Sequence, residues 1–208
     1  RQLAVKPAAQ SGKFSKVFDE VLGGSPRGAS LYDVGVGLRL RHEATRKFDY
    51  IATKPPHEAL HNEFVTSGAV LSEFRAAKDN GDLPPLYWNH PAVKSSPTVD
   101  VIPFCIYLDG VAFGRGENCL GFWCYWLFSK QRHLVAVLRK SELCSCSCRG
   151  WCSVEPIWNM LAWSVCALQS GTYPSARHDL LPWRESDAAR GPMSASPFGF
   201  KACCLFIK

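Results

Sequence analysis

The sequence lacks any apolar run approaching the roughly 18 to 20 continuous residues that span a bilayer. Its longest apolar runs, residues 119–128 and 157–168, have lengths that suit a buried strand and a core helix. No internal repeat is evident either, which argues against a solenoid or another repeat protein. We therefore expect a globular protein without a membrane-spanning segment.

A polar C-terminal tail is also missing from the sequence. It begins with Arg1 rather than methionine, and it ends in the apolar stretch 202–208 with no polar tail. Natural termini are usually polar and frayed. We therefore expect this chain to be a piece of a longer polypeptide.

The composition is that of a globular protein, because 47% of the residues are hydrophobic and 20% are charged. Ten cysteines would suit a secreted disulfide scaffold, but they crowd into the second half of the chain. Several lie on apolar runs, where free cysteine behaves as a small buried hydrophobe. We expect reduced core residues at Cys105, Cys124, Cys166, Cys203 and Cys204, and hence a nuclear or cytoplasmic protein.

The first 82 residues read as a mainly helical segment. Ser11 can cap a helix whose apolar residues recur at helical spacing until Gly23 and Gly24 end it. Pro55 and Pro56 start a second helix that continues to Asn80 and Gly81. Residues 31–51 have both strand-like alternation and weakening glycines, and they stay unassigned. Residues 83–98, which contain prolines, read as a linker.

From residue 99 the pattern changes to strands. Apolar runs predict strands at 101–108, 119–128 and 133–138, the last two joined as a hairpin. Apolar residues at helical spacing predict a helix over 154–168, and a polar loop leads to a strand at about 200–207. Continuous apolar runs in the first and last strands indicate that both are covered on two faces and lie centrally in a sheet. The fold class is therefore α/β, in the order strand, strand, strand, helix, strand.

Asp109 is the first candidate for chemistry, because it directly follows an apolar run and precedes Gly110. An acid at the end of a central strand lies at the rim of a sheet, where ligands and metals generally bind. A carboxylate there can hold Mg²⁺ or Mn²⁺ for phosphodiester cleavage, although one carboxylate is not sufficient. The alternative is that Asp109 and Gly110 simply form a turn.

Residues 83–208 resemble the opening of the ribonuclease H-like fold of DDE-type transposases and integrases. Asp109-Gly110 ends the first strand, Gly121 lies early in the hairpin, and a long helix and a fourth strand follow. The chain also resembles an uncharacterised multicopy protist family of transposase-derived appearance. That likeness rests on Leu108-Asp109-Gly110-Val111, Arg132-His133-Leu134, Cys148-Arg149-Gly150-Trp151-Cys152 and Pro182-Trp183-Arg184.

The resemblance implies an incomplete ribonuclease H-like sheet over residues 99–208. Asp109 matches the first acidic position of the catalytic set. The second acid is expected at or just after the end of the fourth strand, where this chain stops at Lys208. We therefore expect this chain to be catalytically inactive even if its parent is active.

Four thiols, at Cys144, Cys146, Cys148 and Cys152, form the second candidate site. Zinc binds four thiolates tetrahedrally, and one loop between a strand and a helix can supply them. The usual signature instead pairs cysteines in two separate knuckles, and the Cys-x-Cys-x-Cys spacing is tight for one ion. Reduced free thiols and disulfide or redox use remain alternatives.

The net charge of +6 suits contact with a polyanion such as DNA. The residues that would bind nucleic acid are Lys130, Arg132, Arg139, Lys140 and Arg149. An ordinary solvated basic face is an equally good interpretation. The chain's tryptophans can stack bases, but at strand and helix spacing they are more often core residues.

Residues 57–61 match the His-Glu-x-x-His motif of zinc proteases, with His57 and His61 as ligands and Glu58 as base. Its context argues against that function. Pro55 and Pro56 place His57 in an exposed first turn, and the best third ligand, Glu73, is only a guess.

The sequence thus supports two main hypotheses. The first is a fragment of a transposase-like, metal-dependent protein that cleaves nucleic acid. The alternative is a non-enzymatic module, stabilised by zinc, that binds nucleic acid or protein. The sequence gives no indication of the oligomeric state.

Overall fold

The computed structural model describes residues 31–39, 46–113 and 117–205. The helix expected between Ser11 and Gly24 lies outside these ranges. The strands are β1 (Tyr32–Arg39), β2 (Arg46–Thr53), β3 (Val101–Phe113), β4 (Glu117–Trp126), β5 (His133–Arg139) and β6 (Lys201–Cys204). The helices are α2 (Pro56–Ser67), α3 (Ala69–Asp79), α4 (Pro85–Trp88), α5 (Pro91–Lys94) and α6 (Trp151–Ser170), with short 3₁₀ turns η1 (Lys140–Glu142) and η2 (Glu185–Asp187).

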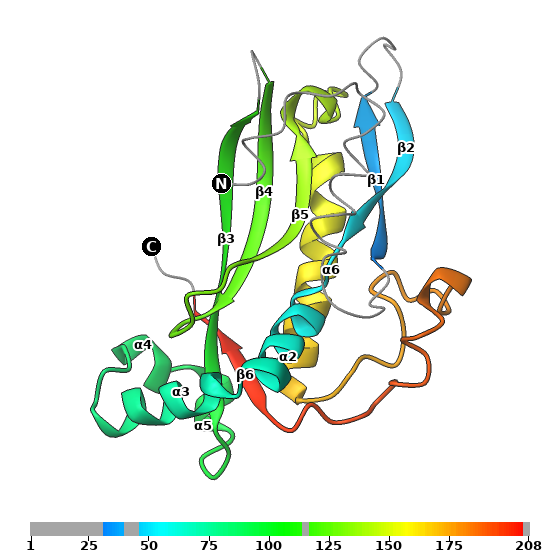
Figure 1. Ribbon diagram of the computed structural model, residues 1–208. Helices are drawn as coiled ribbons and strands as arrows, with labels where there is room; N and C mark the ends of the chain where they lie inside the picture. The colour runs from blue at the N-terminus through cyan, green and yellow to red at the C-terminus, as the bar shows by residue number, and fades with distance from the viewer. Residues whose placement is uncertain (1–30, 40–45, 114–116, 206–208) are drawn as a thin grey trace.

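The main sheet has four strands in the order β5-β4-β3-β6 (Figure 1). β3, β4 and β5 are antiparallel neighbours, whereas β6 pairs with β3 in parallel. The chain order β3, β4, β5, α6, β6 confirms the predicted succession of strand, strand, strand, helix and strand. The fold class, mixed α/β, is confirmed as well.

The described parts of the stretch 31–51, which the sequence left unassigned, contribute to a separate antiparallel hairpin of β1 and β2. The backbone N–H of Lys54, just after β2, donates to Val135 O on β5 over 2.8 Å. The described part of residues 1–82 therefore combines a hairpin with helices, where a mainly helical segment was expected. The predicted second helix does start at Pro56, but Gly68 divides it into α2 and α3 with a left-handed φ of 62°.

α6 joins the sheet to the hairpin. It is the helix predicted over 154–168, and left-handed glycines, Gly150 and Gly171, flank both of its ends. On one side Trp158 contacts Phe122 of β4 edge to face, with ring centroids 6.0 Å apart. On another, Trp163 stacks on Tyr32 of β1 at 5.4 Å. The helix therefore holds the two sheets in one core.

The buried hydrophobic residues form one main cluster that extends from Tyr32 to Leu205. It includes Leu83 and Tyr87 from the stretch expected to be a linker, which folds into α4 and α5. None of the helices in the described ranges combines the length and apolar character that crossing a bilayer requires.

β6 corrects one expectation from the apolar runs. It lies at the end of the strand order rather than centrally, because its described residues pair only with β3. Its residues Ala202 and Cys203 are nevertheless fully buried, since α6 and α5 pack against the strand. An apolar run thus indicated burial correctly and strand position wrongly. The expected core cysteines are buried except Cys166, which is exposed on α6.

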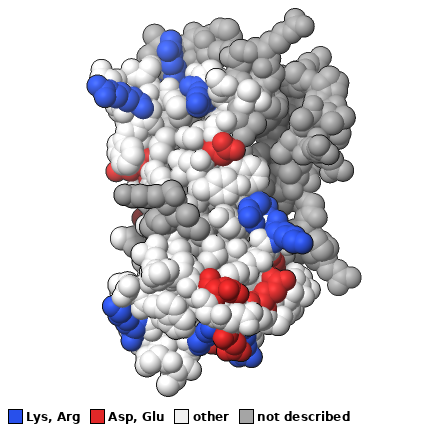
Figure 2. Space-filling view, turned by 90° about the vertical axis from the view of Figure 1, so that its left-hand side faces the viewer, with Lys and Arg blue, Asp and Glu red and all other residues white. Residues whose placement is uncertain are grey.

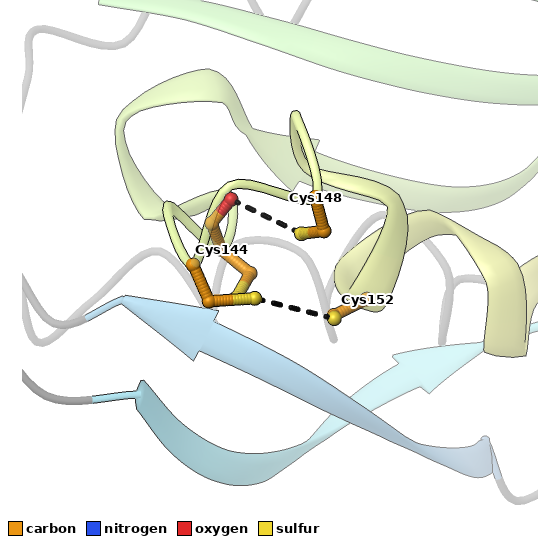
Figure 3. Close-up of side chains that lie close together, drawn as sticks. Cys144, Cys148 and Cys152 are labelled. Atoms are coloured by element: carbon orange, nitrogen blue, oxygen red, sulfur yellow. Dashed lines mark hydrogen bonds between the residues drawn. The ribbon is translucent and has the colours of Figure 1, made fainter.

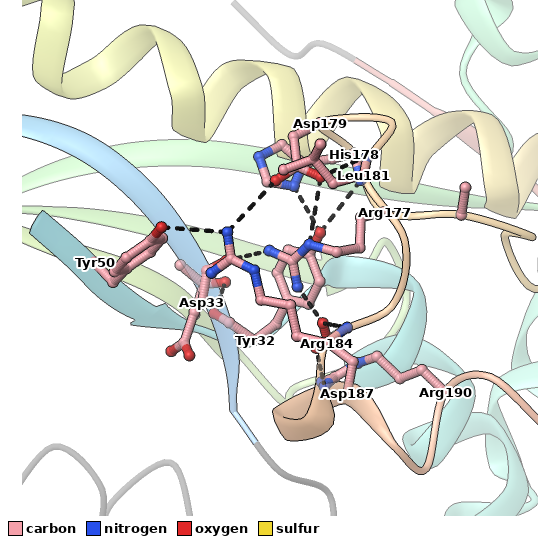
Figure 4. A network of polar contacts seen from close by, with 12 residues as sticks. Tyr32, Asp33, Tyr50, Arg177, His178, Asp179, Leu181, Arg184, Asp187 and Arg190 are labelled. Carbon is pink, nitrogen blue, oxygen red and sulfur yellow. Dashed lines mark hydrogen bonds and ion pairs between the residues drawn. The ribbon is translucent and has the colours of Figure 1, made fainter.

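The long loop 172–197 is attached to the hairpin by buried charges (Figure 4). Arg177 and Asp187, both fully buried, form an ion pair. Arg177 also donates to Asp33 O on β1 over 2.8 Å, and its guanidinium lies 4.5 Å from the centre of the Tyr32 ring. Arg190 pairs with Asp187 at 3.1 Å and with Glu58 of α2 at 2.6 Å. The loop is therefore fixed to both β1 and α2.

Candidate metal centre

Three cysteines of the loop between η1 and α6 and a fourth in the first turn of α6 come together in space. The sulfur atoms of Cys144, Cys146, Cys148 and Cys152 all lie within 4.8 Å of one another. The distance from Cys146 Sγ is 3.3 Å to Cys144 Sγ and 3.6 Å to Cys152 Sγ. Tetrahedral zinc with Zn–S bonds of about 2.3 Å needs sulfur atoms roughly 3.8 Å apart. The observed set therefore needs only small shifts to surround one ion.

The thiols are free rather than paired in disulfides, because an S–S bond is about 2.05 Å long. Figure 3 shows the side chains of Cys144, Cys148 and Cys152 close together at the start of α6. Within the described ranges, no other group of three or more His, Cys, Asp or Glu side chains is close enough to hold an ion. The cysteine spacing that looked tight in the sequence is therefore compatible with a single site.

An unusual backbone brings the thiols together. Ser147 and Arg149, which separate Cys146, Cys148 and Gly150, have left-handed φ values of 69° and 53°. Non-glycine residues adopt this conformation at a cost of about 1 kcal/mol or more each, so the surrounding structure must enforce it. The backbone N–H of Gly150 donates to Cys144 O over 3.1 Å and closes the loop. The loop therefore has the compact, strained form typical of a ligand site.

Gly150 is required where the loop enters α6. Its φ of 85° disfavours any other residue, and a Cβ would lie 3.3 Å from the Leu143 side chain. Ser153, in the first turn of α6, then ties the loop to its surroundings. Its hydroxyl accepts from the backbone N–H of Cys144 over 2.8 Å and donates to Gly37 O on β1 over 2.5 Å. The cluster is thus anchored to both α6 and the hairpin.

The electrostatics of the loop favour negative sulfur. The backbone N–H of Cys152 donates to Cys148 and lowers the pKa of Cys148 to about 6. Hydrogen bonding to Cys148 raises the pKa of Cys152 to about 12, while the positive charge of Arg46 acts in the opposite direction. Cys148 thus forms a thiolate readily. A cation such as Zn²⁺ would replace the remaining thiol protons and leave four thiolate ligands.

Asp109 does not lie where the sequence placed it. β3 continues beyond residue 108 to Phe113, and Asp109 pairs with Gly121 in the middle of the β3–β4 ladder. It is therefore neither at the end of a strand nor in a turn. Its side chain is exposed, and it belongs to no group of potential metal ligands among the described residues.

The five basic residues expected to bind nucleic acid divide into two groups at opposite ends of β5. Lys130 and Arg132 lie in the turn that precedes β5. Arg139 ends the strand, Lys140 begins η1, and Arg149 lies in the cysteine loop. Arg139 is 3.5 Å from Glu142 in an ion pair, whereas Lys130, Arg132 and Lys140 are exposed.

The His-Glu-x-x-His residues are committed to other partners. His57 is 1% exposed, not in an exposed turn, and its Nδ1 lies 2.9 Å from Ser164 Oγ on α6. His61 Nδ1 contacts the Tyr173 hydroxyl at 2.8 Å, and Glu58 pairs with Arg190. The prolines start the helix as expected but direct its first turn into the core. The metalloprotease interpretation is therefore not supported by this geometry.

The buried His57 should make the protein sensitive to acid. Burial, together with Arg190 and His61, lowers its pKa to about 3 from the ordinary 6.5. Between pH 6.5 and pH 3 the His57 imidazole is therefore protonated in the unfolded chain but not in the folded chain. The free energy of unfolding falls as the pH drops through this range. At pH 5 this single group should lower the free energy of unfolding by about 2 kcal/mol.

We expect His57→Gln to lose less stability than the wild-type chain between pH 7 and pH 5, because glutamine does not titrate. Urea unfolding of both proteins at the two pH values measures this difference. Any constant effect of the substitution cancels in the comparison. An unchanged loss in the variant would show that His57 does not carry the acid sensitivity.

The tryptophans differ in their surroundings. Trp126 is buried, and its Nε1 donates to Leu60 O over 3.2 Å, as expected of a core residue. Trp158 and Trp163 pack partly buried against the core, but Trp151 is 54% exposed beside the cysteine loop. Trp123 lies on the face of the sheet away from Phe122 and Trp158, and it stacks beside Tyr107.

Sequence reasoning missed two buried polar groups that tie distant segments together. Glu63 on α2 lies 2.6 Å from His133 Nε2 on β5, and it accepts from Ser129. The other group is the network around Arg177 and Asp187. Buried charges of this kind are separated by up to 132 residues in the chain, as for Glu58 and Arg190. No local spacing signals such a pairing.

Comparisons with protein-family models, with curated proteins and with solved structures find no match to this chain. The geometry of the chain's own residues is therefore what indicates its function.

Proposed function

We propose that this chain is a non-enzymatic α/β module that is stabilised by zinc and binds nucleic acid. The observation that carries the proposal is the approach of four thiols, three from one loop and one from the start of α6, to within 4.8 Å of one another. Thiolates are soft ligands that favour zinc over Mg²⁺ or Ca²⁺. Four protein ligands leave no open position for substrate, which is typical of structural rather than catalytic zinc.

The zinc ion would cross-link the four cysteines and so hold this part of the chain in one conformation. The loop that carries it contacts β1 through Ser153 and Gly37, and it begins α6, which packs on both sheets. A zinc ion bound to four thiolates has a net charge of −2, and Arg46, whose charge acts on Cys152, would partly neutralise it. The site thus combines stability with a fixed start for α6.

Nucleic acid is the proposed partner because of the chain's charge. The net charge is +6, and exposed Lys130, Arg132 and Lys140 lie near the two ends of β5. Cations on a folded surface bind phosphates and release counterions from them. DNA in the nucleus or cytoplasm is the partner that we propose.

Zinc analysis tests the first part of this proposal. Protein purified without chelator, or refolded with one equivalent of Zn²⁺, is expected to retain about one zinc per chain after gel filtration, as measured by elemental analysis. Mg²⁺ in excess should not displace it. A chain that folds fully and retains no zinc would contradict the proposed metal site.

A second candidate is that the parent protein is a transposase-like nuclease with this chain as its first part. The observation in its favour is the parallel pairing of β6 with β3, the strand that carries Asp109. That arrangement suits an incomplete ribonuclease H-like sheet, in which Asp109 would be the first of several acids that hold Mg²⁺ or Mn²⁺. Asp109 has no acidic partner within ligand distance among the described residues, so we expect no cleavage by this chain. Mg²⁺ binding that disappears in Asp109→Asn would favour this second candidate over the first.

A further inference from the structure

Two faces of the main sheet differ in what covers them. Along β4, Phe122, Cys124 and Trp126 are buried, and Phe122 contacts Trp158 of α6. The alternate residues Trp123 and Tyr125 therefore lie on the opposite face, away from α6. Their partners in the β3 ladder are Tyr107 and Cys105. This second face, formed by β3, β4 and β5, is called the outer face below.

Three aromatic rings form a continuous group on the outer face. Tyr107 and Trp123 are nearly parallel, with an interplanar angle of 10° and ring centroids 6.2 Å apart. Tyr125 meets Tyr107 edge to face at 5.8 Å. Tyr107 is 36% exposed, which is unusual for a large aromatic side chain in the middle of a sheet. A gap at Gly121 helps to place Trp123, because a Cβ there would lie 2.7 Å from Trp123 Nε1.

A basic side chain completes the group. The Arg132 guanidinium lies 3.7 Å from the centre of the Tyr125 ring. Its positive charge and the negative charge of Asp109 both act on Tyr107, in opposite directions. Its Nη1 donates to the carbonyls of Ser129 and Gln131. In the described part of the chain it forms no ion pair with a carboxylate, and exposed Lys130 lies two residues away. Figure 2 views the molecule from the side on which β3 lies in Figure 1, and charged side chains are sparse over the middle of this side.

We propose that the outer face binds single-stranded DNA, with bases stacked on Tyr107 and Trp123 and phosphates held near Arg132. Any base can stack on aromatic rings exposed on a sheet, while Arg and Lys side chains bind the phosphates along the DNA backbone. A duplex keeps its bases stacked internally, so it cannot use these rings. The cations beside the rings, Arg132 and Lys130, outnumber the carboxylate of Asp109 there and favour a polyanion over an apolar protein partner. The inference rests on the proposed binding of nucleic acid and specifies its site and its substrate class.

Fluorescence anisotropy with zinc-loaded protein tests this inference. The probes are a fluorescein-labelled oligothymidine strand of 12 nucleotides and a labelled 12-base-pair duplex at the same salt concentration. We expect the single strand to bind at least tenfold more tightly than the duplex. Tyr107→Ala and Trp123→Ala should each weaken single-strand binding by about tenfold, the scale of one lost base stack.

Two further variants separate stacking from misfolding. Gly121→Ala keeps every aromatic side chain but displaces the Trp123 indole. It should therefore weaken the binding of single-stranded DNA without lowering the zinc content. Arg132→Gln should weaken binding and reduce its salt dependence by about one phosphate contact. The matched control is Trp88→Ala, which removes a tryptophan that is 45% exposed on α4 and should leave binding unchanged.

The outcomes distinguish this inference from the proposed function. If DNA binds but only Lys140→Gln or Arg149→Gln weakens it, nucleic-acid binding stands and the outer face is not its site. Equal affinity for the duplex would also overturn the stacking inference alone. If neither probe binds to the zinc-loaded protein, both the inference and the proposed nucleic-acid function are wrong.

Discussion

Cys146→Ser is expected to abolish stoichiometric zinc binding and to lower the melting temperature by well over 10 °C. The sulfur of Cys146 lies 3.3 Å from that of Cys144 and 3.6 Å from that of Cys152. Serine is nearly isosteric but provides a hard hydroxyl in place of a thiolate, and zinc at such a site strongly prefers sulfur. The variant therefore tests the metal rather than the packing.

The effect on stability is expected to be large because the free energy of binding a structural metal becomes free energy of folding. The cluster also lies where the loop before α6 meets β1. Leu143, just before Cys144, bridges to Leu38 of β1, and Ser153 bonds to Gly37. Without the metal, the left-handed residues Ser147 and Arg149 lose the ligand that compensates for their strain. The loop and the start of α6 should therefore loosen together.

Cys166→Ser provides the matched control, since Cys166 is an exposed thiol on α6 outside the cluster. It should retain about one zinc per chain and the wild-type melting temperature. A strong chelator should lower the melting temperature of the wild-type and Cys166→Ser proteins to that of Cys146→Ser. If Cys146→Ser instead has the same melting temperature as the wild-type protein and the chelator has no effect, the four thiols are simply reduced side chains that bind no metal.

Local patterns predicted the elements that depend on local spacing. The apolar stripe of α6 from Val154 to Leu168 repeats over about four turns, and neither sheet pairing nor distant charges need to be known to recognise it. The hairpin of β4 and β5 was equally local, because the short polar stretch 129–132 separates two apolar runs. The strand order β5-β4-β3-β6 could not be predicted from local patterns, since pairing between β3 and β6 joins residues about 100 positions apart.

The errors had physical causes that can be identified. Gly110 looked like the end of a strand because glycine weakens strands, yet here pairing with Leu120 continues through it to Phe113. His57 looked exposed because polar residues usually face water in a first helical turn, but Ser164 on α6 supplies a buried partner. The cysteine cluster was visible in the sequence, whereas its suitability for one ion depended on left-handed Ser147 and Arg149, which sequence spacing does not reveal.

Asp187→Asn is expected to destabilise the fold by about 3 to 5 kcal/mol, the usual cost of removing one partner from a buried ion pair. Asp187 is fully buried and pairs with both Arg177 and Arg190. The substitution leaves the guanidinium of Arg177, also fully buried, without its main counter-charge. Its remaining carboxylate, Asp179, lies 3.3 Å from Nε and is partly exposed, so it can compensate only weakly.

Urea unfolding at pH 7 measures this cost, and Asp179→Asn is the matched control. Because Asp179 is 29% exposed, water can replace its charge, and we expect a loss of at most about 1 kcal/mol. The double variant Arg177→Met with Asp187→Leu should recover much of the stability lost in Asp187→Asn, since it removes both buried charges together. Recovery would show that the cost lies in the unpaired guanidinium rather than in the shape of the loop. An Asp187→Asn protein as stable as Asp179→Asn would mean that the loop 172–197 is held to β1 and α2 by its apolar contacts instead.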